Sequence, residues 1–213
     1  MKLERYQEAL PLAKEGLLIR ERIHQEPHPE TAASLGMNAN ILTRLQQFDE
    51  AIASRKKSIE ILKNVFGEEH QYIGISYSSL AGILFEKGDI EESEKFYNKS
   101  LVLNRKLFPQ GNHNISTPLI GLGKIEHLRR EYKNAKNYFK EGYLIRSKGF
   151  PSGHLKIAES AELLADVLVE LGERMNAKEL YEEAENILTK TYGENDEKST
   201  KLLDKLNNLK EDH

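Results

Sequence analysis

Cysteine is absent from all 213 residues of the sequence. This absence excludes disulfide bonds, thiol catalysis and thiolate metal sites together, and it is consistent with a reducing compartment. Long apolar runs are lacking too, because the longest fall far short of the roughly 18 residues that a membrane-spanning helix needs. The first residues, Met1 to Arg5, lead straight into a charged helical pattern without the apolar segment of a secretory signal. We therefore expect a cytoplasmic protein that does not enter a membrane.

An excess of charge of either sign is also lacking. Lys and Arg number 31, Asp and Glu number 34, and the formal net charge is -3. A chain so near to neutrality has no electrostatic footprint for nucleic acid or for an anionic membrane surface, so neither is expected as a partner. Hydrophobic residues make up 38% of the chain, which is enough to bury a sizeable core.

What the sequence does contain is a repeat with a period of 42 residues. One column of this repeat holds small residues, namely Ala9, Ala51, Ser93, Ala135 and Ala177. A second holds the aliphatic residues Ile19, Ile61, Leu103, Ile145 and Ile187. A third holds polar residues typical of helix starts, His28, His70, Asn112, His154 and Asp196, and a fourth holds the rings Phe66, Phe108, Phe150 and Tyr192. Chance does not align so many columns, so we expect repeated structural units.

Each period contains two helices. Apolar residues recur at spacings of three and four, which indicates amphipathic helices, and turn signals such as Gly88 and Gly172 divide the period in two. We call the first helix of a unit its A helix and the second its B helix. The A helices are expected at about 29–45, 71–87, 113–129 and 155–171, and the B helices at about 3–23, 48–65, 90–107, 132–149 and 174–191.

The sequence thus predicts a single all-α domain over residues 1–213. This domain begins with the helix at 3–23 and ends with a capping helix at 197–210. Four repeat units, which we number 1 to 4, lie between them at about 29–66, 71–108, 113–150 and 155–192.

The residues at fixed places within the units resemble the tetratricopeptide repeat, and the period resembles its kinesin light chain variety. Repeat 2 carries the pattern as Tyr77, Leu80-Ala81, Leu84, Gly88, Ser93, Tyr97 and Ser100, and repeat 3 as Leu119, Leu122-Gly123, Tyr132, Ala135, Phe139 and Gly142. Repeat 1 departs from it, with Asn38 in place of a leucine and Arg55 in place of an aromatic residue. The resemblance implies a right-handed α-α superhelix, a tetratricopeptide-type solenoid of helical hairpins, that binds proteins and is not an enzyme.

In this family the partner lies in a concave groove lined by the A helices. The groove positions fall here on Met37, Asn40, Arg44, Ile75, Ser78, Ser79, Phe85, Ile120, Lys124, His127, Glu159, Glu162, Asp166 and Glu170. Small residues in the first three repeats leave room for a peptide backbone. Apolar residues such as Met37, Ile75 and Ile120 either supply contact area for the partner or complete the core beneath the groove.

The A helix of repeat 4 is acidic along one side. Glu159, Glu162, Asp166, Glu170 and Glu173 recur at spacings of three and four, so they share one helical face. Like charges at these spacings repel one another, and nothing in the local sequence offsets the repulsion. Two interpretations stay open: a solvated face, or a contact surface for a basic segment of a partner.

No catalytic, cofactor or metal site is predicted. Histidine is a common metal ligand, and the chain has three at His28, His70 and His154. Their place in one column of the repeat indicates that they begin helices and do not form a metal site. Gly121-Leu122-Gly123-Lys124 resembles a phosphate-binding loop, but it lacks the required spacing and lies inside an A helix.

The two ends of the chain lead to different expectations. Leu202, Leu203, Leu206 and Leu209 form an apolar stripe that should pack the C-terminal helix on the last hairpin. The N-terminal helix matches a B helix without an A helix before it, which leaves an apolar face uncovered. Three functions follow: an adaptor that binds a peptide or partner protein, a regulatory or sensor segment of a larger signalling protein or enzyme, and a scaffold that self-associates through the N-terminal helix.

Overall fold

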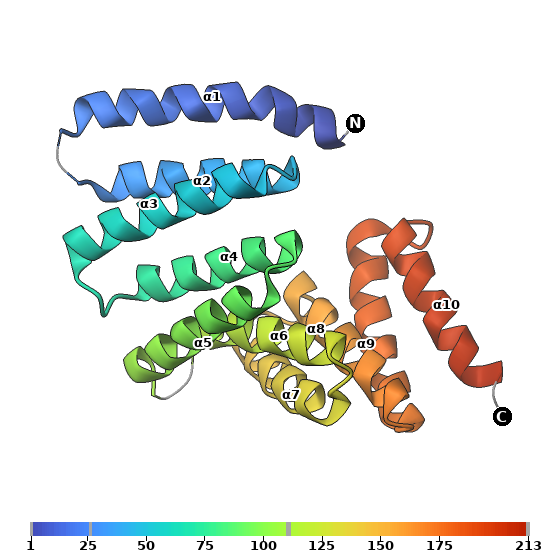
Figure 1. The fold of residues 1–213 in the computed structure, drawn as a ribbon. Helices are drawn as coiled ribbons and strands as arrows, with labels where there is room; N and C mark the ends of the chain where they lie inside the picture. Colours follow the sequence, from blue (N-terminus) through green and yellow to red (C-terminus); the bar gives the residue numbers. More distant parts are fainter. Residues whose placement is uncertain (1, 26, 110–111, 212–213) are drawn as a thin grey trace. The chain divides into compact units, whose positions relative to one another are not determined.

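The computed structural model describes residues 2–25, 27–109 and 112–211, and every regular element in these ranges is an α-helix (Figure 1). The helices are α1 (Lys2–Ile23), α2 (Pro29–Arg44), α3 (Phe48–Phe66), α4 (Gln71–Lys87), α5 (Ile90–Leu107), α6 (His113–Leu128), α7 (Tyr132–Gly149), α8 (Leu155–Glu170), α9 (Arg174–Tyr192) and α10 (Glu197–Glu211). The expected all-helical fold is therefore confirmed, and each helix begins and ends within one residue of its expected bounds. None of the described helices is long and apolar enough to cross a bilayer.

The polar column of the repeat is a column of helix N-caps. His28, His70 and His154 each accept a hydrogen bond at Nδ1 from the backbone N–H two residues later, over 3.1 to 3.3 Å. Asn112 and Asp196 accept the equivalent bond at Oδ1, over 2.9 and 3.0 Å. Each bond satisfies one of the backbone N–H groups that the first turn of a helix leaves without an intrahelical partner.

The aromatic column stacks on these caps. The ring of Phe66 lies 4.3 Å from that of His70, and the ring of Phe150 lies 4.4 Å from that of His154, both in stacked geometry. At the turns into α4 and α8 the chain therefore passes over a ring pair, and the imidazole is held in place for its capping bond.

The helices form two compact units, Met1–Pro109 and Gln110–His213. In the N-terminal unit, α2 pairs with α3 and α4 with α5, while α3 also packs on α4 and α1 on α2. Its core consists of small clusters of aliphatic residues, among them Leu42, Ala51, Ile73 and Leu80.

In the C-terminal unit, α6 pairs with α7 and α8 with α9, α7 packs on α8, and α10 packs on α9. One core cluster joins Phe139, Leu164, Tyr181, Leu202 and Leu206 with their neighbours. The two leucines of α10 are buried, as a capping helix requires, whereas Leu203, expected in the same stripe, is 46% exposed. The single domain expected over the whole chain stays a prediction.

The small column brings paired helices together. Ala51, Ser93, Ala135 and Ala177 are all 0% exposed, because no larger side chain separates the A helix from the B helix there. Four residues later, Tyr97, Phe139 and Tyr181 are buried between helices, and Arg55 occupies this position in repeat 1. Repeat 1 therefore buries a charged guanidinium at the place where the other three repeats bury an aromatic ring. The candidate site described below lies in this repeat.

Candidate functional site

A cavity of about 600 Å³ opens between α2 and α4 in the N-terminal unit. Its floor comes from α3 and its sides from the two A helices. The lining residues are Pro29, Glu30, Ala32, Ala33, Gly36, Met37, Asn40, Arg55, Ser58, Leu62, Tyr72, Ile75, Ser76 and Ser79. The volume lies within the range of cavities that bind small ligands or peptide side chains.

Small residues keep this cavity open, and large apolar residues surround it. Gly36 and Ala33 on α2 and Ser76 and Ser79 on α4 are among the lining residues. Met37, Tyr72 and Ile75 are 60%, 45% and 40% exposed. Because these three side chains hold apolar area in contact with water, a ligand that covered them would gain free energy at about 25 cal/mol per Å².

Arg55 lies at the bottom of the cavity and is only 7% exposed. Its Nη2 donates to the backbone oxygen of Gly36 over 2.9 Å and to Oδ1 of Asn40 over 2.8 Å. Its Nε is buried without a hydrogen-bond partner, and no described carboxylate forms an ion pair with it. Burial lowers the pKa of this guanidinium to about 10, because the charged form is poorly solvated there.

Four of the predicted groove residues of the N-terminal unit line this cavity, namely Met37, Asn40, Ile75 and Ser79. Arg44 is exposed at the end of α2, and Phe85 is half-buried on α4, both outside the cavity lining.

Ser78 and Ile120 are two further predicted groove residues, and both are buried; for Ile120 this favours the alternative that it completes the core beneath the groove. Ser78 is 5% exposed, and its Oγ lies 2.7 Å from Oγ of Ser100 on the paired B helix. Ile120 is 3% exposed, and it packs closely on its paired B helix. A Cβ atom added to Gly142 on that helix would lie 2.8 Å from Cδ1 of Ile120. The two residues occupy equivalent places in their repeats, and this place faces the partner helix of the hairpin. Lys124 and His127, on the same helix as Ile120, are half-buried.

The acidic face of α8 is paired with cations from other helices of the C-terminal unit. Lys205 on α10 contacts both Glu162 and Asp166 at 2.7 Å. Glu159 contacts Lys124 at 3.2 Å and Arg146 at 3.1 Å. No residue near these carboxylates in the sequence was expected to offset their repulsion, and the compensating charges come instead from residues distant in the sequence.

These pairs shift the pKa values of the groups involved. Burial acts to raise the pKa of Glu159, but the charges of Arg146 and Lys124 outweigh it, and the pKa is lowered. Burial acts to lower the pKa of Lys205, but its hydrogen bonds to Asp166 and Glu162 raise it overall. Asp166 also accepts a hydrogen bond of 2.6 Å from the hydroxyl group of Tyr181. Glu170 is exposed, and Glu173, the last predicted residue of the face, lies beyond the end of α8 and contacts Lys136 at 2.7 Å.

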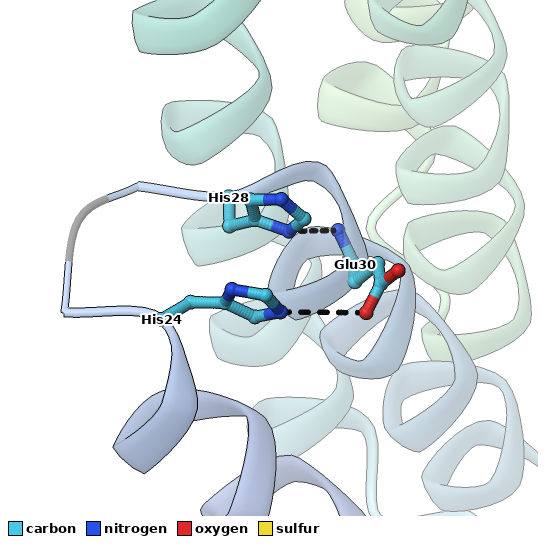
Figure 2. Close-up of side chains that lie close together, drawn as sticks. All are labelled: His24, His28 and Glu30. Atoms are coloured by element: carbon cyan, nitrogen blue, oxygen red, sulfur yellow. Dashed lines mark hydrogen bonds and ion pairs between the residues drawn. The ribbon is translucent and has the colours of Figure 1, made fainter.

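Figure 2 shows a group of potential metal ligands at the start of α2, formed by His24, His28 and Glu30. Their ligand atoms lie within 4.8 Å of one another. The two imidazole rings are stacked with centroids 3.7 Å apart, and Nε2 of His24 lies 3.3 Å from Oε2 of Glu30. His24 stands at the place of Phe66 and Phe150 in the repeat, so this stack is the same cap arrangement that begins α4 and α8. We therefore assign the group to the capping of α2.

Comparison with known proteins gives matches of two kinds. A model of the tetratricopeptide repeat matches residues 36–106 and 72–148, together more than half of the chain, and a second tetratricopeptide repeat model matches residues 1–30. None of the curated proteins matches the chain in sequence.

Solved structures are similar in fold. BtubC (BKLC) from P. vanneervenii has a TM-score of 0.71 at 17% identity, over 89% of this chain and 75% of that one. The TPR-like repeats of a proposed kinesin light chain from Podosopora anserina score 0.64 at 21% identity, over 89% and 90%. The apo form of the quorum sensor NprR from B. thuringiensis scores 0.69 at 18% identity, over 97% of this chain and 53% of that one.

Proposed function

Because the chain belongs to the tetratricopeptide repeat family, we propose that it binds an extended peptide segment of a partner protein in the cavity between α2 and α4. The observation that carries this proposal is the open, mainly apolar cavity of about 600 Å³ with Met37, Tyr72 and Ile75 exposed around it. The repeat architecture supports this proposal, because the residues that pack the A and B helices together leave the opposite face of each A helix, which lines the groove, free to contact a ligand.

The lining also supports binding rather than catalysis. It offers serine hydroxyl groups, but none of its residues is a histidine or cysteine that could act with them as a base or nucleophile. The hydroxyl of Ser58 already donates to the backbone oxygen of Ala32 over 2.8 Å. The proposal therefore contains no catalytic step. It includes a cytoplasmic location, with which the absence of cysteine is consistent.

The test is a selection of binding peptides from a random library against the full chain, followed by titration of the best peptide by fluorescence anisotropy. Ile75→Asp places a charge on the apolar rim and should weaken binding at least about tenfold. Met175→Asp is the matched control, because Met175 is 70% exposed on α9 and lies outside the cavity. Equal affinities of the two variants and the parent would contradict the proposed site.

A second candidate is a sensor or regulatory segment of a larger protein. The fold of this chain matches about half the length of NprR, which is described as a quorum sensor. In this case the same cavity would receive the signal, and binding would change the activity of an attached domain. Joining of the chain to such a domain in the native protein, seen by mass spectrometry of the purified protein, would favour the second candidate over a free-standing adaptor.

Two finer expectations also remain proposals. The acidic face of α8 binds a basic segment of a partner only in competition with Lys205, which already contacts Glu162 and Asp166. Self-association through α1 is supported by Leu12 and Ile23, which are 70% and 67% exposed on that helix.

A further inference from the structure

We propose that the cavity between α2 and α4 binds a carboxylate side chain of the docked peptide, with Arg55 as the counter-ion. This inference rests on the proposed function and adds to it the chemistry of the ligand: an extended segment with Asp or Glu between apolar residues.

The guanidinium of Arg55 uses only part of its hydrogen-bonding capacity. An arginine has five N–H donors, and both bonds of Arg55 to the protein come from Nη2. Nε is buried and has no partner. A buried guanidinium with an unpaired donor is costly for the folded protein, because Nε has lost water without gaining an acceptor.

The other buried arginine of the described residues shows what Arg55 lacks. Arg146 is 4% exposed, and its guanidinium contacts the carboxylate of Glu159 at 3.1 Å and the backbone oxygen of Lys156 at 3.0 Å. A buried charge is ordinarily retained in this way, with an opposite charge beside it. In the described part of the chain, no carboxylate forms an ion pair with Arg55.

The acidic residue of the cavity lining is turned to other partners. Glu30 lines the same cavity, but its carboxylate lies 3.3 Å from His24 and 3.9 Å from Arg20, outside the site, as Figure 2 shows for His24. The protein thus provides a buried cation in a cavity without its counter-ion. Charge complementarity identifies the missing group as an anion of the ligand.

Gly36 leaves Arg55 accessible from the cavity. A Cβ atom at Gly36 would lie 2.8 Å from Nη1 of Arg55, so any larger residue would collide with the guanidinium or cover it. Since both residues line the cavity, the space above Gly36 leads to Nη1. A carboxylate that enters there can accept from Nη1 and form a charge-assisted hydrogen bond away from bulk water.

The walls of the cavity determine the kind of anion. Met37, Tyr72 and Ile75 present apolar area around the opening, which suits apolar residues on both sides of a single acidic one. The depth of Arg55 suits a carboxylate on a side chain, because the backbone of the segment can then lie along α2 and α4. A terminal carboxylate is the competing source, and the experiment separates the two.

The probes are four peptides of nine residues built from Leu, Ala and Ser. Three have blocked ends and carry Glu, Gln or Lys at the centre, and the fourth has Gln at the centre and a free C-terminal carboxylate. Their affinities for the full chain are measured by isothermal titration calorimetry. We expect the Glu peptide to bind at least about tenfold more tightly than the Gln and Lys peptides, as a charge-assisted hydrogen bond would provide.

The matched variant is Arg55→Tyr, which restores the ring found at this place in repeats 2 and 4. The variant should fold and lose the preference for Glu over Gln, and Arg55→Gln serves as a second variant should the ring not fit. Equal binding of the Glu and Gln peptides, or a Glu preference that persists in both variants, would overturn the inference.

The outcomes also separate this inference from the proposed function. If all four peptides bind equally and Ile75→Asp weakens them all, the docking site stands and the carboxylate subsite does not. Tighter binding of the peptide with the free terminus alone would overturn the side-chain assignment. Should none of the peptides bind the parent chain, both the subsite and the proposed docking site would be rejected for this class of ligand.

Discussion

The ring of Phe139 on α7 lies directly against Gly123 on α6, so that a Cβ atom added to this glycine would be 2.5 Å from Cδ1 and Cε1 of the ring. Phe139 is 1% exposed, and it belongs to the core cluster that unites α6 to α10. The position of Gly123 holds alanine in the other three repeats, at Ala39, Ala81 and Ala165. The smallest residue and a buried ring therefore occur together in repeat 3, and this contact makes the packing of that repeat testable.

Phe139→Ala should lower the free energy of unfolding by about 3 to 5 kcal/mol, because the ring leaves a cavity that the surrounding helices fill only in part. Denaturant unfolding followed by circular dichroism measures the change. Leu144→Ala on the same helix is the control, since Leu144 is 44% exposed and should cost far less. A loss below about 1 kcal/mol for Phe139→Ala would contradict the buried register of α7.

Gly123→Ala should also destabilise the protein, by about 1 to 3 kcal/mol, because the added methyl group collides with the ring of Phe139. The direction is informative, since alanine favours a helix over glycine by about 1 kcal/mol in the absence of a collision. Gly82→Ala on α4 is the matched case, because its Cβ would lie 3.6 Å from the hydroxyl of Tyr97. Thermal melting should show a lower midpoint for Gly123→Ala and an equal or higher one for Gly82→Ala.

Much of the fold could be predicted because its determinants recur along the sequence. The period of 42 residues places every helix, and the N-cap column follows from the side chains that can accept a bond from a first-turn N–H. The aromatic column begins at Phe66 and does not include the imidazole of His24, so it does not predict the stack of His24 on His28. The same spacing, extended one unit back, would have identified His24.

The candidate site was less accessible to prediction, since it depends on which side of each A helix faces its B helix. The place shared by Ser78 and Ile120 faces the paired B helix, whereas Met37 and Ile75, at two other places of the repeat, are exposed. Arg55 was seen only as a departure from the pattern, and its burial without a counter-ion required the three-dimensional contacts. The partners of Glu162 and Asp166 are likewise remote, because Lys205 follows them by 43 and 39 residues.

The ion pairs of Glu159 should make part of the stability depend on pH. The pKa of Glu159 is lowered in the folded protein, so its stabilising effect is present above the pKa of the unfolded chain and is lost as the pH falls through the folded value. Wild type should therefore be more stable than Glu159→Gln at pH 7, and the difference should shrink as the pH falls below about 4.5. A difference that is constant from pH 7 to pH 3 would contradict the pairing with Arg146 and Lys124.

The apolar side of α1 should cause self-association at high concentration. Leu12 and Ile23 are among its exposed residues, and Ala9 is half-buried although its equivalents in the other repeats are fully buried. Light scattering over a series of concentrations should show a rise in mean mass. Leu12→Lys together with Ile23→Lys should abolish the rise, whereas Leu144→Lys on α7 should not. A protein that stays monomeric at high micromolar concentration would remove this scaffold hypothesis.

Removal of Lys205 should expose the acidic face of α8 to an external cation. In wild type the ammonium group of Lys205 lies 2.7 Å from Glu162 and from Asp166, and it stands over the ring of Tyr181 at 5.7 Å from the centroid. A basic segment must displace this group before it can bind the same carboxylates.

Lys205→Ala should therefore bind a short oligolysine peptide more tightly than wild type does at low salt, and the gain in affinity should fade as salt is added. Lys201→Ala on the same helix is the control, because Lys201 pairs with Glu197 within α10 and not with α8. The same affinity for wild type and Lys205→Ala would mean that the acidic face is a structural ion-pair network closed by α10 and not a contact surface for a basic partner.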